Sequence, residues 1–188
     1  MNNANRFELR GINHLALTCA DMARTIDFYR DVLGMPLVKT IDFPVSPAAG
    51  AGAGAGGGGG GGMHYFFDCG NGDCVAFFEF PGGPKSVDLK THGKLAATPG
   101  MMHHVAFNVS NEQIDAYRQR LLDAGVEVTE VVNHDDSPSG ASAEVNATTF
   151  VRSIYFRDPD GMQLEFAAWS RTLNSQDVRA DLRASLAN

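Results

Sequence analysis

The sequence predicts an α+β fold built from two tandem βαβββ modules. Three observations lead to this prediction. Short stretches recur at a nearly constant offset, each recurrence combines a strand pattern with a helix pattern, and turn-forming residues separate the strands that follow. The chain has 188 residues, of which 44% are hydrophobic, enough for one compact domain or two small modules that share a core.

An internal repeat is the strongest sign of the two modules. The stretch NHLAL at residues 13–17 resembles HHVAF at 103–107, at an offset of 90. The stretch IDFYR at 26–30 resembles IDAYR at 114–118, at an offset of 88. Matches at almost one spacing indicate that one structural unit occurs twice.

Each copy opens with a strand and continues with a helix. The opening strands show alternating character and are expected at residues 14–19 and 104–109. The helices are expected at residues 21–33 and 111–124, with Asp21 and Asn111 as N-caps. Gly34 and Gly125 are expected to end these helices in the left-handed conformation.

Three further strands are expected in each copy. In the first copy they cover residues 37–43, 65–69 and 75–80, and in the second 127–133, 149–156 and 163–168. Asn71-Gly72 and Asp158-Pro159-Asp160-Gly161 supply the turns before the closing strands. The predicted organisation is a first module at 11–82, a linker at 83–100, a second module at 101–169 and a tail at 170–188 containing a closing helix.

Residues 48–62 are Ala and Gly alone and predict a mobile loop, because fixing so many glycines costs much conformational entropy. The segment serves either as a plain linker within a hairpin or as a lid.

Composition excludes several classes of partner. The formal net charge is −7, and no basic stretch interrupts the acidic balance, so neither nucleic acid nor an anionic membrane surface is an expected partner. No apolar run approaches the ~18 residues that span a membrane. The polar first six residues lack the layout of a signal peptide, which predicts a cytoplasmic protein. Three cysteines without a C-x-x-C pair argue against a disulfide framework.

Candidate metal ligands lie on the strands. Side chains alternate between the faces of a strand, so His14 and its counterpart His104 each share a face with small residues, opposite an apolar face. Glu165 lies on the non-core row of the last strand, where an ionised carboxylate is costly unless it is paired or binds a metal. Glu79 lies near the end of the first module's last strand, as a positional counterpart of Glu165.

A lone His or Glu on a strand usually has no special role. Joint occurrence at matching places nevertheless predicts a metal site formed by His14, His104 and Glu165, with Glu79 as a possible fourth ligand. His103 is expected to be structural or to support its neighbour. The remaining histidines are expected in or beside loops and give a weak signal: His64, His92 and His134.

These residues also lie in stretches that resemble a known family. GINHLAL at 11–17, FYRDVLG at 28–34 and YFRDPDG at 155–161, running on to Leu164-Glu165, resemble the vicinal oxygen chelate superfamily. This superfamily includes glyoxalase I, extradiol ring-cleaving dioxygenases, fosfomycin-resistance proteins and methylmalonyl-CoA epimerase. The resemblance covers residues 11–169 and implies a cupped mixed sheet around a divalent metal. It also implies a homodimer or a higher homo-oligomer.

Position by position, His14, His104 and Glu165 match the three metal ligands of the extradiol type. Tyr155 matches a tyrosine that hydrogen-bonds the substrate oxygen, a catalytic role in that family. The resemblance therefore implies an Fe(II)-dependent extradiol dioxygenase that acts with O2 on a catechol-type substrate, for example a biphenyl-diol. Phenylalanines near residues 66–80 suit an aromatic substrate, although core packing explains at least half of them.

Glu79 keeps a second function open. Larger extradiol enzymes place a catalytic histidine on this strand, whereas a glutamate resembles glyoxalase I, in which carboxylates bind the metal and move a proton. The alternative is a glyoxalase-like lyase or isomerase with Ni, Zn, Co or Mn. In either enzyme Glu79 is a candidate acid–base. A binding protein of the bleomycin-resistance type is disfavoured, because it needs neither the two histidines nor the two glutamates.

Overall fold

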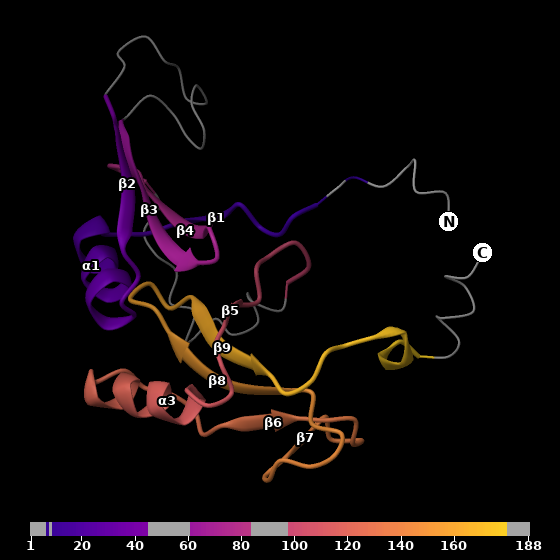
Figure 1. Ribbon diagram of the computed structural model, residues 1–188. Coiled ribbons are helices and arrows are strands. Elements are labelled where there is room, and N and C mark those ends of the chain that lie inside the picture. Colours follow the sequence, from indigo (N-terminus) through magenta and orange to yellow (C-terminus); the bar gives the residue numbers. More distant parts are fainter. Residues whose placement is uncertain (1–6, 8, 45–60, 84–97, 180–188) are drawn as a thin grey trace. The chain divides into compact units, whose positions relative to one another are not determined.

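The protein has an α+β fold with two sheets, which confirms the fold class predicted from sequence (Figure 1). The computed structural model describes residues 7, 9–44, 61–83 and 98–179. Most of the Ala/Gly segment at 48–62, most of the linker at 83–100 and the end of the tail lie outside the described residues. The chain divides into two compact units, of which the first comprises residues 11–105 and 157–163 and the second 1–10, 106–156 and 164–188.

The first unit holds a four-stranded sheet with the order β1-β4-β3-β2. Its strands are β1 (His14–Thr18), β2 (Leu37–Phe43), β3 (Gly62–Gly70) and β4 (Asp73–Glu79). β1 runs parallel to β4, and the other neighbours are antiparallel. Asn71 has φ 61° and Gly72 has φ 84°, the left-handed backbone that a two-residue hairpin turn requires.

One helix covers one face of this sheet (Figure 1). α1 (Met22–Ile26) begins at Asp21, whose carboxylate accepts from the backbone N–H of Arg24 at 3.1 Å, as predicted. It continues into a π-helix, η2 (Asp27–Val32), and Gly34 follows with φ 78°. Tyr29 of η2 packs against Phe77 and Phe67 with ring centroids 4.6 and 5.6 Å apart, so this face of the sheet is the core of the first unit.

The turn at Asp158–Gly161 belongs to the first unit and is anchored by a buried carboxylate. Asp158 accepts from the backbone N–H groups of Asp160 and Met162 at 2.9 and 2.8 Å, and from the Tyr29 hydroxyl at 3.2 Å. Burial raises the pKa of Asp158 from 3.8 to about 6 despite these hydrogen bonds. The same burial, with the charge of Asp158, raises the pKa of Tyr29 well above its usual value.

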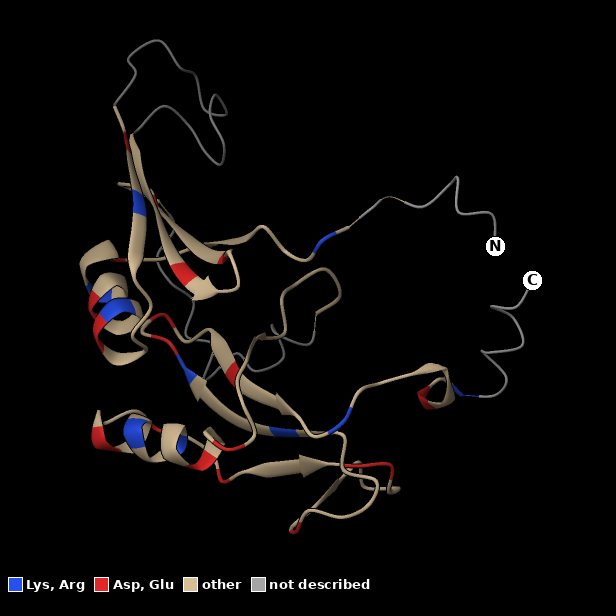
Figure 2. Cartoon of the chain, viewed as in Figure 1, with Lys and Arg blue, Asp and Glu red and all other residues tan. Residues whose placement is uncertain are grey.

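The second sheet has the order β5-β9-β8-β6-β7. Its strands are β5 (Val105–Asn108), β6 (Val132–His134), β7 (Ala141–Ser142), β8 (Val151–Arg157) and β9 (Gln163–Trp169). α3 (Ile114–Asp123) packs on one face, where Tyr117, Phe107 and Phe156 surround Phe166. Charged residues of both signs lie along α3 (Figure 2).

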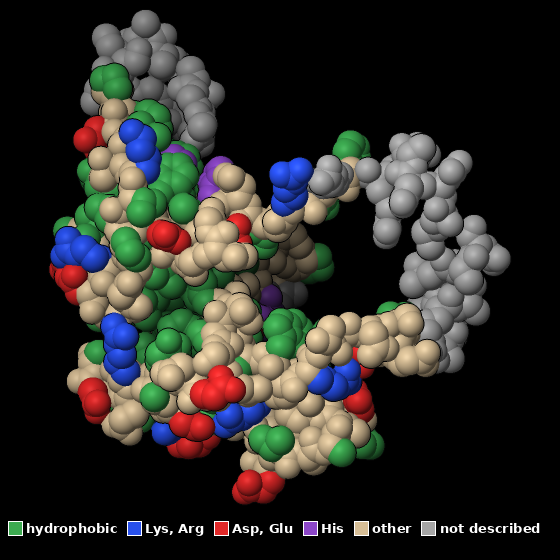
Figure 3. Space-filling model, in the orientation of Figure 1, with side chains coloured by type: hydrophobic (Ala, Val, Ile, Leu, Met, Phe, Trp, Pro, Cys, Tyr) green, Lys and Arg blue, Asp and Glu red, His purple; other side chains and the backbone are tan. Residues whose placement is uncertain are grey.

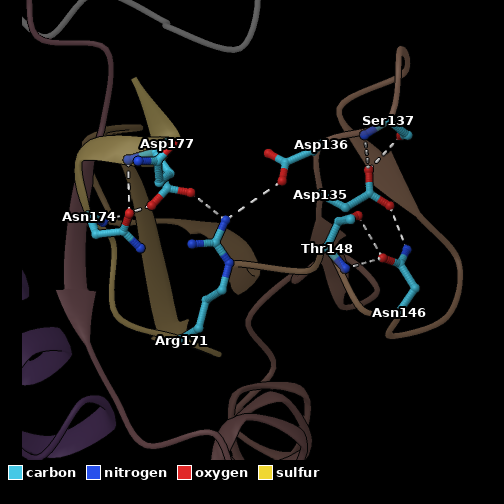
Figure 4. Close-up of polar contacts among 9 residues, drawn as sticks. Asp135, Asp136, Ser137, Asn146, Thr148, Arg171, Asn174 and Asp177 are labelled. Carbon is cyan, nitrogen blue, oxygen red and sulfur yellow. Dashed lines mark hydrogen bonds and ion pairs between the residues drawn. The ribbon is translucent and has the colours of Figure 1, made fainter. Parts of the chain in front are cut away.

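A polar network organises the loop after β6 (Figure 4). The buried Asp135 accepts from the backbone N–H of Ser137 at 3.0 Å and from the Asn146 amide at 2.7 Å, and it also bonds the hydroxyls of Ser137 and Ser142. Hydrogen bonds from these hydroxyls and from the amide hold the pKa of Asp135 far below its usual range. In the same unit, Nη2 of Arg171 forms ion pairs with Oδ2 of Asp136 at 3.6 Å and with Oδ1 of Asp177 at 2.6 Å.

Several predicted elements differ from those observed. α3 begins three residues after Asn111, which does not cap the helix, because its Oδ1 has no hydrogen-bond partner among the described residues. The Nδ2 amide of Asn111 instead donates to the Trp169 carbonyl at 3.0 Å. β6 is much shorter than the strand predicted at 127–133, and β7 was not predicted. In the described part of the tail, only Ser175–Asp177 is helical, as a 3₁₀ turn. None of the helices in the described ranges is both long and apolar enough to cross a membrane.

Candidate metal and substrate site

The face of the first sheet opposite α1 carries His14 in an aromatic surrounding. The register pairs His14 with Cys74 and Leu17 with Phe77, so His14 lies on the face opposite the buried core. The His14 ring lies 5.5 Å from that of Phe66. In the space-filling view, hydrophobic side chains gather over this unit with histidine among them (Figure 3).

His64 lies on this same face, which the sequence did not indicate. It belongs to β3, is paired with Phe78, and stacks on that ring with centroids 3.6 Å apart. The residue is 8% exposed, and its Nε2 has no hydrogen-bond partner among the described residues. Burial, with a contribution from His14, lowers the pKa of His64, so the ring is neutral at neutral pH.

Glu79 lies on the other face of the first sheet. It shares the row of Val75 and Phe77, which packs under the helix, and its carboxylate accepts from the backbone N–H of Met22 at 2.6 Å. A carboxylate at the start of a helix satisfies a free amide and interacts favourably with the helix dipole. The placement assigns Glu79 a capping role and does not support it as a partner of His14 at one metal ion.

The true counterpart of Glu165 in the first module is Ala76. Glu165 follows Gly161 by four residues, and Ala76 follows Gly72, the matching glycine of the other hairpin, by four. Ala76 also lies on the same face of its sheet as His14. The repeat therefore carries a carboxylate at this position in the second module and a methyl group in the first.

Each of the two predicted histidine ligands has a hydrogen bond at Nδ1. Nδ1 of His14 lies 2.8 Å from Oδ1 of Asn13, and Nδ1 of His104 lies 2.7 Å from Nδ1 of His103. An amide oxygen can only accept, so the proton of His14 resides on Nδ1 and Nε2 is the nitrogen that could bind a metal. The His104 contact is compatible with the same tautomer.

The face of the second sheet opposite α3 carries Glu165, Tyr155 and His134. Glu165 is only 5% exposed and lies on the row opposite Leu164 and Phe166, as predicted from strand alternation. The Tyr155 hydroxyl lies 3.0 Å from Nε2 of His134, the last residue of β6, which was predicted to lie in or beside a loop.

The surroundings of Tyr155 favour its protonated form. Burial, then the charge of Glu165, raises the pKa of the Tyr155 hydroxyl. At neutral pH the phenol therefore keeps its proton. When Nε2 of His134 carries the ring proton, it donates to the Tyr155 oxygen and orients the hydroxyl, and the O–H of Tyr155 acts as a donor. The second unit thus brings together two predicted residues and one that sequence reasoning missed.

The predicted site residues are distributed over the two units. His14, Glu79 and His104 belong to the first unit, and Tyr155 and Glu165 to the second. Within the described residues, no group of three or more His, Cys, Asp or Glu side chains is placed to hold one metal ion. Strand parity could have indicated His64, because it is two residues before Phe66 in an apolar strand. The strand predicted at 127–133 ends one residue before His134, so the sequence did not place this histidine on it.

Two units, each with a helix on one face of its sheet and imidazole or carboxylate groups on the other, define a class of small α+β proteins. The chain belongs to the Glyoxalase/Bleomycin resistance protein/Dioxygenase superfamily, whose family model matches residues 11–166. This confirms the resemblance detected in the sequence motifs.

Individual relatives are distant. The metallothiol transferase FosB of Shouchella clausii is 26% identical over 158 residues, which cover 84% of this chain and 79% of that protein. A glyoxylase/bleomycin resistance protein/dioxygenase domain from Frankia sp. EAN1pec has a TM-score of 0.57 at 20% identity, covering 90% of this chain and 99% of its own. The fosfomycin resistance protein FosX from Listeria monocytogenes, in complex with Mn(II) and sulfate, has a TM-score of 0.52 at 19% identity over 90% and 99% of the two chains. At these identities the solved structures support the fold alone.

Proposed function

We propose that this protein is a divalent-metal enzyme in which His14, His104 and Glu165 bind the metal. The donor set fits such an ion, because two imidazoles and one carboxylate suit Fe(II), Mn(II) and related metals. The Nδ1 hydrogen bond of His14 directs Nε2 toward ligation, and Glu165 supplies a buried carboxylate on the face of its sheet away from α3. Glu79 is left out of this set, because it caps α1.

Within this class we infer an extradiol ring-cleaving dioxygenase that uses Fe(II) and O2 on a catechol-type substrate. The carrying observation is the Tyr155 hydroxyl, which His134 orients at 3.0 Å on the face that carries Glu165. A phenol that keeps its proton at neutral pH can donate a hydrogen bond to a substrate oxygen. Phe66 and Phe78 supply ring surfaces for an aromatic substrate. When bound, Fe(II) with these three ligands offers open coordination positions for vicinal oxygens and O2.

A metallothiol transferase is the second candidate. The 26% identity to FosB over most of the chain favours it, because that relative is named for thiol transfer. The glyoxalase-like reaction with Ni, Zn or Co remains a third possibility for the same donor set. All three share the metal site and differ in the substrate.

The first experiment is oxygen uptake by Fe(II)-reconstituted protein given catechol or 3-phenylcatechol, with absorbance followed for a yellow ring-cleavage product. A Tyr155→Phe variant should be impaired, whereas Tyr65→Phe, which removes a hydroxyl bonded to Asp42, should not. Uptake with a yellow product supports the dioxygenase. If iron-loaded protein shows no uptake, this function fails for both substrates. Thiol conjugation of fosfomycin by Mn(II)-loaded protein would then support the second candidate.

The oligomeric state stays a prediction. A homodimer is expected for a protein of this superfamily, and sedimentation equilibrium of the full chain measures it directly.

A further inference from the structure

The residue before each predicted histidine ligand makes a hydrogen bond to it. In the first copy, Oδ1 of Asn13 lies 2.8 Å from Nδ1 of His14. In the second copy, Nδ1 of His103 lies 2.7 Å from Nδ1 of His104, with the rings 5.0 Å apart and inclined by 79°. The 90-residue offset of the repeat relates both pairs, so the same contact occurs at matching positions with different chemistry.

Both contacts depend on where the strands begin. Neighbouring residues within a strand point to opposite faces and do not contact each other through their side chains. β1 begins at His14 and β5 begins at Val105, so Asn13 and His103 precede the regular pleat. Their side chains can therefore turn back toward the following imidazole.

We propose that Asn13 and His103 are positioning residues for the metal ligands, an inference that rests on the proposed function. Each accepts a hydrogen bond from the Nδ1–H of the following histidine. The accepted bond fixes ring orientation and the tautomer in which Nε2 carries the lone pair that binds the metal. A partner of this kind also increases the basicity of the ligating nitrogen.

The hydrogen bond in the first copy indicates which histidine donates in the second copy. Asn13 presents an amide oxygen to His14, which leaves His14 as the donor. His103 can accept in the same way when its own proton is on Nε2, and then His104 donates from Nδ1. If this assignment is correct, an asparagine can replace His103, because it supplies an acceptor at the equivalent place in the repeat.

The test is Mn(II) binding by the full-length apoprotein, followed by the electron paramagnetic resonance signal of free Mn(II). Asn13→Ala and His103→Ala should each weaken binding by about 10- to 100-fold. His103→Asn should restore affinity to within a few-fold of wild type. Gln119→Ala, which removes an exposed amide on α3, is the matched control and should bind as wild type. Circular dichroism of each variant verifies folding, and Asn13→Asp, which keeps an acceptor oxygen, substitutes if Asn13→Ala does not fold.

The outcomes separate the inference from the proposed function. If wild type binds Mn(II) and His14→Ala abolishes binding, but the two alanine variants bind as tightly as wild type, the positioning role is refuted and the metal enzyme stands. If His103→Asn binds as weakly as His103→Ala, the acceptor assignment is refuted. If wild type does not bind Mn(II), or His14→Ala and His104→Ala bind unchanged, both proposals fall.

Discussion

Replacing Asp158 by asparagine should change how stability depends on pH. Relative to wild type, the variant should gain unfolding free energy as the pH rises from acidic to neutral. Burial raises the pKa of Asp158 from 3.8 to about 6. The folded state therefore holds this proton more tightly than the unfolded state, and the free energy of unfolding falls as the pH rises from about 4 to about 6. A difference of about 2 pKa units corresponds to about 3 kcal/mol in total.

Roughly half of that change falls between pH 5 and pH 7.5. An asparagine has no proton to lose there, and its oxygen can still accept from the N–H groups of Asp160 and Met162. The unfolding free energy of Asp158→Asn minus that of wild type should therefore increase by about 1.5 kcal/mol from pH 5 to pH 7.5.

Urea denaturation followed by far-UV circular dichroism at pH 5, 6 and 7.5 measures this shift. Asp27→Asn is the control, because the Asp27 side chain is 75% exposed and its loss should produce no comparable shift. A difference between Asp158→Asn and wild type that stays constant across the three pH values would refute the reasoning that burial, rather than hydrogen bonding, dominates at Asp158.

Four further changes test the assignments. Tyr155→Phe should lower kcat/KM for the substrate by about 10- to 100-fold while Mn(II) affinity stays within a few-fold, since it removes one hydrogen bond and no ligand. Glu79→Ala should cost about 1 kcal/mol of unfolding free energy without changing bound metal; lost metal would restore Glu79 as a ligand. His64→Phe should raise unfolding free energy by about 1 kcal/mol, measured by urea denaturation, because it removes an unpartnered buried nitrogen. Asp135→Ala should speed proteolysis of the loop after β6, and unchanged cleavage would count against its organising role.

Strand alternation predicts the sheet faces on which His14 and Glu165 lie. The face that carries His14 and the face that carries Glu165 follow from the two-residue period, because one row of each strand is apolar enough to pack under a helix. The left-handed turn at Asn71-Gly72 and the helix end at Gly34 are local, since each depends on the backbone conformations a few residues permit.

Glu79 shows that distance from a strand end is a poor guide to which face a side chain occupies. Its distance from the strand end matches that of Glu165, but the row it shares with Val75 and Phe77 places it under α1. Counting residues from the glycine of each hairpin turn identifies Ala76 as the position equivalent to Glu165. This count predicts the face of a side chain better than distance from the strand end, because the turn fixes the strand register.

By itself, the sequence determined the α+β class, the family and the strand faces on which His14 and Glu165 lie, because these depend on periodicity and on local turn chemistry. Tertiary structure alone decided that His134 hydrogen-bonds Tyr155, that Nε2 of the buried His64 has no hydrogen-bond partner in the described part of the chain, and that Asn111 donates to the Trp169 carbonyl. These contacts join residues distant in the chain or depend on how neighbouring strands cover a side chain. No local sequence pattern encodes them, because strand pairing and burial decide whether a polar group finds a hydrogen-bond partner and which one.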